Sequence, residues 1–292
     1  AVEAANLGAK VVVVEKMGMP GGNTIRAAGG LNAAGTALQQ AKGTKDSVEI
    51  AYFDTMKGGH WKNDPELVRT LVAGAGPSVE WLLALGGDLR DVGLLAGASK
   101  ARAHRPTGGA LVGPEVVRTL YTAAKDRKID MRMNTEATKI LTDDGKVTGI
   151  QVKSKKDGTY TIHAKAVVNA AGGFGANNEL VSKYVPRLKG FATTNHPGAT
   201  AGALFTLMRA GAIPVHIDYI QWGPWCSPDD KGIGMGADVC DYIKQYGFAI
   251  DPKTGRRCFN ELGNRTELTN DIFSLKNEDG SQRFAVLIAD SQ

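Results

Sequence analysis

The pattern of hydrophobic and polar residues along this chain predicts helices and strands in alternation, joined by turns rich in glycine. Residues 1–7 resemble the end of an apolar helix, which Gly8 terminates. Residues 11–14 are consecutive valines, a β-branched run of the kind found in buried parallel strands. A second run, residues 166–174, is apolar and contains a glycine pair, and we expect a buried strand that leads into a tight turn.

Further along the chain, the apolar positions predict two successive helices after Asp64, a good N-cap that is followed by a proline. Another helix is expected over residues 114–128, and a short strand over residues 130–135. Two Asp-Gly pairs then separate strand-like runs, which is the pattern of an antiparallel meander. Its strands are expected at residues 138–141, 147–153 and 160–162.

The character of the sequence changes after residue 217. Aromatic residues and prolines become frequent, and Trp222 and Trp225 lie close together. A hairpin is expected where residues 246–250 and 257–260 flank a Pro-Lys-Thr-Gly turn. We therefore predict two domains, residues 1–217 and residues 218–292.

Composition narrows the class of protein only a little. The 292 residues are 42% hydrophobic and 22% charged, which is ordinary for a globular protein. The net charge of +5 is spread along the chain, which indicates a mild attraction for anions and no nucleic-acid footprint. No apolar run is long enough to cross a bilayer. The three cysteines, Cys226, Cys240 and Cys258, form no Cys-x-x-Cys pair, and no cluster has metal-ligand spacing, so we expect no metal site.

The first chemical signal follows the valine run. Glu15 ends that run, and an acid at the carboxyl end of a strand in a βαβ unit accepts hydrogen bonds from a ribose diol. Gly21 and Gly22 follow and allow the backbone to approach a large cofactor closely. The Gly-x-Gly-x-x-Gly turn expected just upstream is absent from the sequence. These residues predict a dinucleotide-binding domain that lacks its first strand and phosphate turn, although a strand that ends in glutamate is also common elsewhere.

A set of short segments carries a further signal. They are Val14-Glu15-Lys16, Gly21-Gly22-Asn23, residues 27–34, 54–59, 103–110, 170–174, 194–199 and 219–221, and Gly255-Arg256-Arg257 with Asn260-Glu261. Each is weak alone. Together, and in this order, they resemble the flavoproteins of the fumarate reductase and succinate dehydrogenase superfamily, in particular the flavocytochrome c branch with its urocanate reductase-like relatives.

The resemblance implies an α/β fold, namely an FAD-binding dinucleotide fold of the glutathione-reductase type with an inserted α+β capping domain. Residues 1–217 then correspond to the FAD-binding domain without its first strand and glycine-rich turn, and residues 218–292 to the start of the cap. We accordingly expect a fragment truncated at both ends.

The family's reaction is reduction of an activated carbon–carbon double bond, with a hydride from flavin N5 and a proton from the protein. By resemblance the proton donor is Arg265, which follows Asn260-Glu261, and Asp241 and Lys244 relay the proton to it. In the alternative reading, Arg265 is a surface arginine at a helix start, and Asp241 and Lys244 are solvated charges.

This sequence departs from the family at two points. Relatives carry a carboxylate-binding histidine shortly after Tyr-Ile-Gln, and here that position is Gly223. The neighbouring Trp222 offers a flat apolar surface, so urocanate or another aryl acrylate is favoured over fumarate, unless the tryptophans are only core residues. Relatives also have Gly-Asp-Gly near the flavin where this chain has Ala201-Gly202-Ala203, without the acid.

The resemblance assigns the remaining site residues and a cofactor, FAD. The expected substrate contacts are His104, Thr107, Gly108 and Trp222. The expected FAD contacts are Glu15, Gly21, Gly22, Asn23, Thr24, Ala28, Gly29, Gly30, Ala137, Ala171 and Gly172.

The expected partners are a small unsaturated carboxylate and an electron donor that is haem, covalent flavin or quinol-linked. Kinship alone indicates a periplasmic or membrane-associated protein. Two other functions stay open: an FAD dehydrogenase of the ketosteroid or amino-acid type, and a flavin electron-transfer protein without reductase activity.

Overall fold

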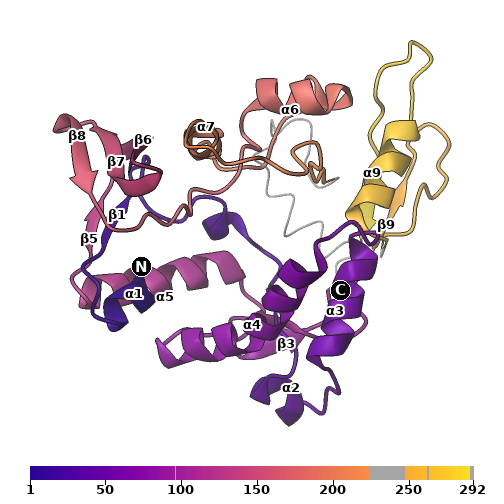
Figure 1. Ribbon diagram of the computed structural model, residues 1–292. Helices are drawn as coiled ribbons and strands as arrows, with labels where there is room; N and C mark the ends of the chain where they lie inside the picture. Colours follow the sequence, from indigo (N-terminus) through magenta and orange to yellow (C-terminus); the bar gives the residue numbers. More distant parts are fainter. Residues whose placement is uncertain (96, 224–246, 262, 290–292) are drawn as a thin grey trace. The chain divides into compact units, whose positions relative to one another are not determined.

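The structure, a computed structural model, describes residues 1–95, 97–223, 247–261 and 263–289 (Figure 1). The chain divides into two compact units. Unit 1 comprises Ala1–Ala27, Leu85–Gly87 and Gly113–Ile220, and unit 2 comprises Ala28–Ala84, Asp88–Val112 and the described part of Gln221–Gln292. The mixed α/β class expected from the sequence is confirmed.

Unit 1 begins with helix α1 (Val2–Asn6), and the chain then enters strand β1 (Val12–Val14). Strand β1 pairs in parallel with β5 (Asp130–Arg132), so that Val13 lies opposite Met131. Of the elements between these strands in the sequence, the 3₁₀ turn η1 (Thr24–Arg26) and nearly all of helix α5 (Val112–Asp126) belong to unit 1. The valine run and the helix predicted over residues 114–128 are therefore found with small shifts at their ends.

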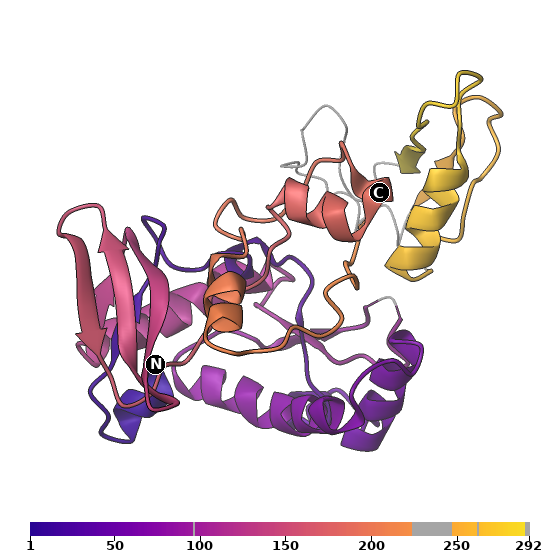
Figure 2. The ribbon, with the colours of Figure 1, turned by 45° about the horizontal axis from the view of Figure 1, so that its top comes forward.

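The predicted meander is the largest sheet of unit 1. Strands β6 (Thr135–Asp143), β7 (Lys146–Ser154) and β8 (Gly158–His163) pair antiparallel in chain order, as Figure 2 shows. The first turn is tight because Asp144 and Gly145 both take positive φ, at 44° and 73°, which suits the twist of a two-residue hairpin. Helix α7 (Gly202–Arg209) packs against β6.

Residues 166–174 are not the buried strand that the apolar run predicted. They form an irregular segment in which the side chain of Val168 is 89% exposed. An apolar run becomes a strand only where a neighbouring strand pairs with its backbone, and no sheet of the described residues includes this segment. Helix α6 (Asn178–Tyr184) follows, capped by the side chain of Asn177, and then the 3₁₀ turn η2 (Pro186–Leu188).

The first part of unit 2 combines helices with a small antiparallel sheet. The sheet has the order β2 (Leu31–Asn32), β4 (Ala103–Arg105), β3 (Asp91–Gly93). The helices are α2 (Ala37–Ala41), α3 (Val48–Gly58) and α4 (Pro65–Ala84). Their core contains Ala34, Ala51, Met56, Val68 and Val72.

The two successive helices predicted after Asp64 are one helix, α4, with Pro77 inside it. The prediction was wrong because proline removes one hydrogen bond but does not always end a helix. Here the apolar side chains of Val68, Val72, Val79 and Leu82 are all buried, and their packing holds the two halves in line.

The last described part of unit 2 consists of two paired strands and a helix, which share a core of their own. Strand β9 (Gly247–Ile250) pairs antiparallel with β10 (Val286–Ala289), and helix α9 (Arg265–Ser274) lies between them in the sequence. Ala249, Phe259 and Leu268 form the core. The predicted hairpin is present as a bridge between Ile250 and Arg257, while the pairing with β10 was not foreseen. None of the helices in the described ranges has both the length and the apolar character that a bilayer crossing requires.

Candidate functional site

Glu15 lies directly after β1, at the carboxyl end of a parallel strand pair. Its backbone continues the pairing with β5, because its N–H donates to the carbonyl of Arg132 at 3.0 Å. One carboxylate oxygen, Oε1, accepts the backbone N–H of Met17 at 2.8 Å, which fixes the side chain. A carboxylate accepts several hydrogen bonds, so this geometry suits a ribose diol as a further partner.

The glycine turn that follows is joined to a distant segment of unit 1. Gly21 and Gly22 have φ values of 125° and 48°, a conformation that favours glycine. The side chain of Asn23 then accepts the backbone N–H of His196 at 2.6 Å and donates to Asn195 Oδ1 at 2.6 Å. These contacts join two of the segments that carry the sequence resemblance, residues 21–23 and residues 194–199.

Two basic side chains strengthen this junction, and the sequence reasoning missed both. Arg26 donates to the carbonyls of Thr194 and Asn195 at 2.8 and 3.1 Å. Lys16 donates from Nζ to Thr200 Oγ1 at 2.7 Å. Positive residues beside a glycine turn are the only signal in the sequence that could have indicated them.

The segment without the expected acid begins helix α7. A Cβ placed on Gly202 would lie 3.4 Å from the Oε1 atom of Glu136, which comes from strand β6. A carboxylate therefore lies beside this helix start although the sequence has none at position 202. The other expected FAD contacts of unit 1 are Thr24, the first residue of η1, Ala137, within β6, and Ala171 and Gly172, in the irregular segment after Asn169.

In unit 2 the predicted contacts Gly29 and Gly30 lead into β2. A Cβ on Gly30 would lie 2.9 Å from the Cβ of Ala103, so only glycine fits against β4 at this point. Ala28, Gly29 and Gly30 thus run beside the strand that carries His104. This close approach fixes the path of the backbone before β2.

The loop after β4 is held by two carboxylates. Thr107 donates to Asp88 from its backbone N–H at 3.0 Å and from its hydroxyl at 2.9 Å. The N–H of Gly108 donates to Asp91 Oδ2 at 2.8 Å. These bonds occupy donors that we expected to contact the substrate, so the loop is preformed by the protein itself. Direct substrate contact by Thr107 and Gly108 stays a prediction.

His104 is fully buried, with an exposed fraction of 0%. Its Nε2 lies 2.9 Å from Thr36 Oγ1, and its Nδ1 lies 3.0 Å from the carbonyl oxygen of Arg102. Burial lowers the pKa of His104 below its ordinary value, and the two backbone carbonyls beside Nδ1 oppose this shift only in part. We expected His104 to contact the substrate, and this contact stays a prediction. In this structure the ring is covered on all sides.

Arg265 is the first residue of α9, and its side chain is exposed. The helix start is well defined, because the side chain of Asn264 accepts the N–H of Glu267 at 3.0 Å in a capping box. Just upstream, Glu261 is buried and pairs with Arg257. Burial alone would raise the pKa of Glu261, but the hydrogen bonds from Arg257 and the Ala249 N–H outweigh it and hold the pKa below its ordinary value.

Trp222 packs edge-to-face on Phe273 of α9, with ring centroids 6.2 Å apart. An aromatic side chain from the segment around Gly223 is thus in contact with the helix that begins at Arg265. The predicted relay residues Asp241 and Lys244, and also Trp225, lie outside the described residues.

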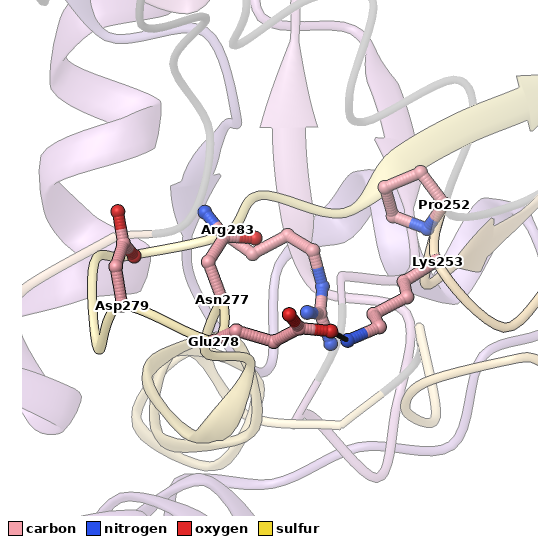
Figure 3. A pocket seen from close by; sticks show the side chains of 6 residues that line it. All are labelled: Pro252, Lys253, Asn277, Glu278, Asp279 and Arg283. Carbon is pink, nitrogen blue, oxygen red and sulfur yellow. Dashed lines mark hydrogen bonds and ion pairs between the residues drawn. The ribbon is translucent and has the colours of Figure 1, made fainter.

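A polar hollow in the last part of unit 2 does not fit a carboxylate substrate. Figure 3 shows its lining, in which Lys253 Nζ faces the carboxylate of Glu278 at 2.8 Å. Arg283 pairs in the same way with Asp251, at 2.8 Å. Both cations are neutralised by the protein's own acids. The lining residues are Pro252, Lys253, Asn277, Glu278, Asp279 and Arg283.

Comparison with known proteins defines the class. The model of a family described as an FAD binding domain matches residues 1–291, and the chain therefore belongs to that family of flavoproteins. The structure fits this cofactor: Glu15 directly follows a parallel strand, and the space beside Gly22 is open, since a Cβ there would meet no atom within 4 Å.

The relatives place the chain in the fumarate reductase branch. It is 46% identical over 275 residues to a fumarate reductase (cytochrome) of Shewanella frigidimarina, covering 94% of this chain and 47% of the relative. It is 31% identical over 278 residues to a urocanate reductase of Eggerthella lenta, covering 93% and 45%. A solved open conformation of a flavocytochrome c3 fumarate reductase matches with a TM-score of 0.82 at 36% identity, over 93% of this chain and 48% of that one. The chain thus spans about half the length of these relatives.

Proposed function

We propose that this chain belongs to a flavoenzyme that reduces the carbon–carbon double bond of an α,β-unsaturated carboxylate, with Arg265 as the proton donor. The observation that carries the proposal is the similarity of the chain to a fumarate reductase (cytochrome), 46% identical over 94% of this chain. Arg265 is exposed at the first position of α9, whose start is fixed by a capping box, and the alternative reading of a surface arginine predicts the same exposure. The named relatives support the reaction class, since they include a fumarate reductase and a urocanate reductase.

The cofactor segments would hold FAD through the residues assigned from the sequence. Glu15 would bind the ribose, and the turn that contains Gly21, Gly22 and Asn23 would pass beside the rest of the dinucleotide. When bound, FAD supplies the hydride for the reduction. The protein's own part is to bind the carboxylate, to exclude water and to deliver a proton from Arg265.

Arginine almost never loses its proton in water, so this role requires a dry closed site and rapid reprotonation. We assign the reprotonation to Asp241 and Lys244. The domain limits at residues 217 and 218 are part of the same proposal, in which the second domain provides the cap over the flavin.

For the substrate, we favour a carboxylate with a ring, such as urocanate or another aryl acrylate. Gly223 has no side chain with which to bind a second carboxylate. The neighbouring Trp222, which packs on Phe273 of α9, offers an aromatic surface for a ring. The urocanate reductase relative supports this preference, whereas the relative at 46% identity is named a fumarate reductase. We propose a haem, covalent-flavin or quinol-linked electron donor as the partner.

The test uses the flavin-loaded protein with reduced methyl viologen as the electron donor and a panel of fumarate, urocanate, cinnamate and methacrylate. Replacing Arg265 by alanine is expected to lower kcat by about 10²–10⁴-fold, the usual contribution of a positioned proton donor. Arg256→Ala, also at an exposed arginine of unit 2, is the control and should retain activity. Full activity of Arg265→Ala would disprove the assignment, and faster turnover of fumarate than of the ring substrates would disprove the substrate preference.

A further inference from the structure

The ring of His104 contacts three segments of unit 2 at once. Nε2 lies 2.9 Å from the hydroxyl of Thr36, the N-cap of α2. Nδ1 lies 3.0 Å from the carbonyl oxygen of Arg102, on the approach to β4, and 3.3 Å from that of Leu31, in β2. With an exposed fraction of 0%, the ring is a buried crosslink between these segments.

The partners determine the tautomer of the ring. Carbonyl oxygens only accept, so Nδ1 must carry the proton and donate it. Nε2 is then an acceptor, and the Thr36 hydroxyl donates to it while accepting the backbone N–H of Gln39 at 3.2 Å. Every polar atom in this chain of bonds therefore has a partner, which is the condition under which a buried polar network stabilises one conformation.

The network continues through charged groups. Gln39 donates from Nε2 to the carbonyl of Ala101 at 2.8 Å and to Asp46 at 2.9 Å. Arg102 bridges Asp46 and Asp54 at 3.0 and 2.9 Å, and its side chain is only 5% exposed. The chain that enters the strand is thus anchored just before His104.

The strands that His104 joins are continuous with two predicted binding segments, one for the cofactor and one for the substrate. Ala28, Gly29 and Gly30 lead directly into β2, which pairs with β4 through Leu31 opposite His104. Thr107 and Gly108 lie in the turn that follows β4 and are held by the carboxylates of Asp88 and Asp91. Movement of the ring would therefore shift the backbone on either side of the paired strands.

We propose that His104 is a positioning residue, which holds Ala28, Gly29 and Gly30 in the conformation that FAD requires. This inference rests on the proposed function, because that proposal places these glycines beside FAD. In this role the ring acts through the backbone of β2.

The experiment compares variants of the full chain by two readouts, hydrogen exchange of the backbone amides at residues 28–32 and the dissociation constant for FAD. His104→Asn keeps a donor near the Nδ1 position and loses the acceptor for Thr36. Thr36→Val removes the hydroxyl, whereas Thr36→Ser keeps it. Val79→Ala, at a fully buried position of α4 outside the network, is the control for a general loss of stability.

We expect His104→Asn and Thr36→Val each to speed exchange at residues 28–32 and to weaken FAD binding about tenfold, the factor that corresponds to about 1.4 kcal/mol. Thr36→Ser should behave as the wild type, and Val79→Ala should change neither readout beyond its effect on overall stability. Unchanged exchange in His104→Asn, or an equal change in Val79→Ala, would overturn the inference. A wild-type chain that binds no FAD would overturn the proposed function instead, while the exchange readout would still test the crosslink.

Discussion

The carboxylate of Glu261 accepts the backbone N–H of Ala249 at 2.7 Å, and both residues are buried, with exposed fractions of 2% and 0%. Strand β9 is thereby joined to the turn that precedes α9 and Arg265. The same carboxylate pairs with Arg257, so a single side chain satisfies two donors. The position of the proposed proton donor thus depends on a residue that does no chemistry itself.

Replacing Glu261 by alanine should therefore destabilise this part of unit 2. The change leaves a buried N–H at Ala249 without its acceptor, which costs about 1–3 kcal/mol, and also removes the ion pair with the exposed Arg257. Urea unfolding measures the free energy of unfolding. Glu278→Ala is the control, because its carboxylate is 90% exposed and its pair with Lys253 should contribute less than about 1 kcal/mol. Equal losses in the two variants would contradict the role of Glu261.

Gly113 is a second test, in unit 1. Helix α5 approaches the turn at residues 24–27 so closely that a Cβ on Gly113 would lie 2.0 Å from the carbonyl oxygen of Thr24. Gly113→Ala should cost about 3 kcal/mol or more of unfolding free energy and weaken FAD binding, because the turn must move. Gly74→Ala is the matched control: a Cβ there meets nothing within 4 Å, and the variant should gain about 0.5–1 kcal/mol in helix α4. A stable Gly113→Ala that binds FAD normally would show that α5 and the turn can separate freely.

The buried His104 predicts a pH dependence of stability. Burial lowers its pKa in the folded chain; the carbonyls of Arg102 and Leu31 and the charge of Glu80 act in the opposite sense, while Lys42 adds to the lowering. The unfolded chain, with a histidine pKa near 6.5, therefore binds more protons than the folded chain at mildly acidic pH. Stability is complete above about pH 6.5 and falls as the pH decreases below it.

Urea unfolding at pH 7.5 and at pH 5.5 measures this effect. The wild type should lose more free energy between the two values than His104→Asn, which has no imidazole to titrate, while all other groups cancel in the comparison. An equal loss in both proteins would show that the pKa of His104 is the same in the folded and the unfolded chain.

The carboxylate of Glu136 beside α7 predicts the effect of restoring the acid that relatives carry in the Gly-Asp-Gly segment. Gly202→Asp should place a second carboxylate close to Glu136 Oε1, because the Cβ of the new residue would lie 3.4 Å from it. Glu136 is exposed to solvent, and like charges about 4 Å apart in water repel each other by about 1 kcal/mol. The double variant Glu136→Gln with Gly202→Asp should recover this loss, since the repulsion is gone. Thermal unfolding measures both, and additive effects of the two changes would contradict the contact.

Local sequence signals predicted much of the fold. The valines of β1, the two Asp-Gly turns of the meander and the proline after Asp64 each act within a few residues, and each is found at its predicted place. The failures arose where distant segments decided the outcome. Residues 166–174 were predicted as a strand, and the residues after Asp64 as two helices, but in each case the result depended on segments that pack from elsewhere.

In the candidate site, too, the sequence marked some residues, whereas only the structure showed the contacts that hold them. The sequence marked Glu15, the glycines at 21 and 22, and His104 as residues of interest, because their types and spacing match a known family. It did not indicate that Asp88 would hold Thr107, or that Arg26 would bind the carbonyls of Thr194 and Asn195.

By itself, then, the sequence determined the family, the cofactor class and the local elements, because turn chemistry and strand patterning are properties of neighbouring residues. Only the tertiary structure decided that His104 is enclosed between Thr36 and two backbone carbonyls, and that Glu261 links β9 to the start of α9. The physical reason is that a buried polar side chain must find partners wherever the folded chain provides them: Thr36 lies 68 positions from His104, and Ala249 lies 12 positions from Glu261.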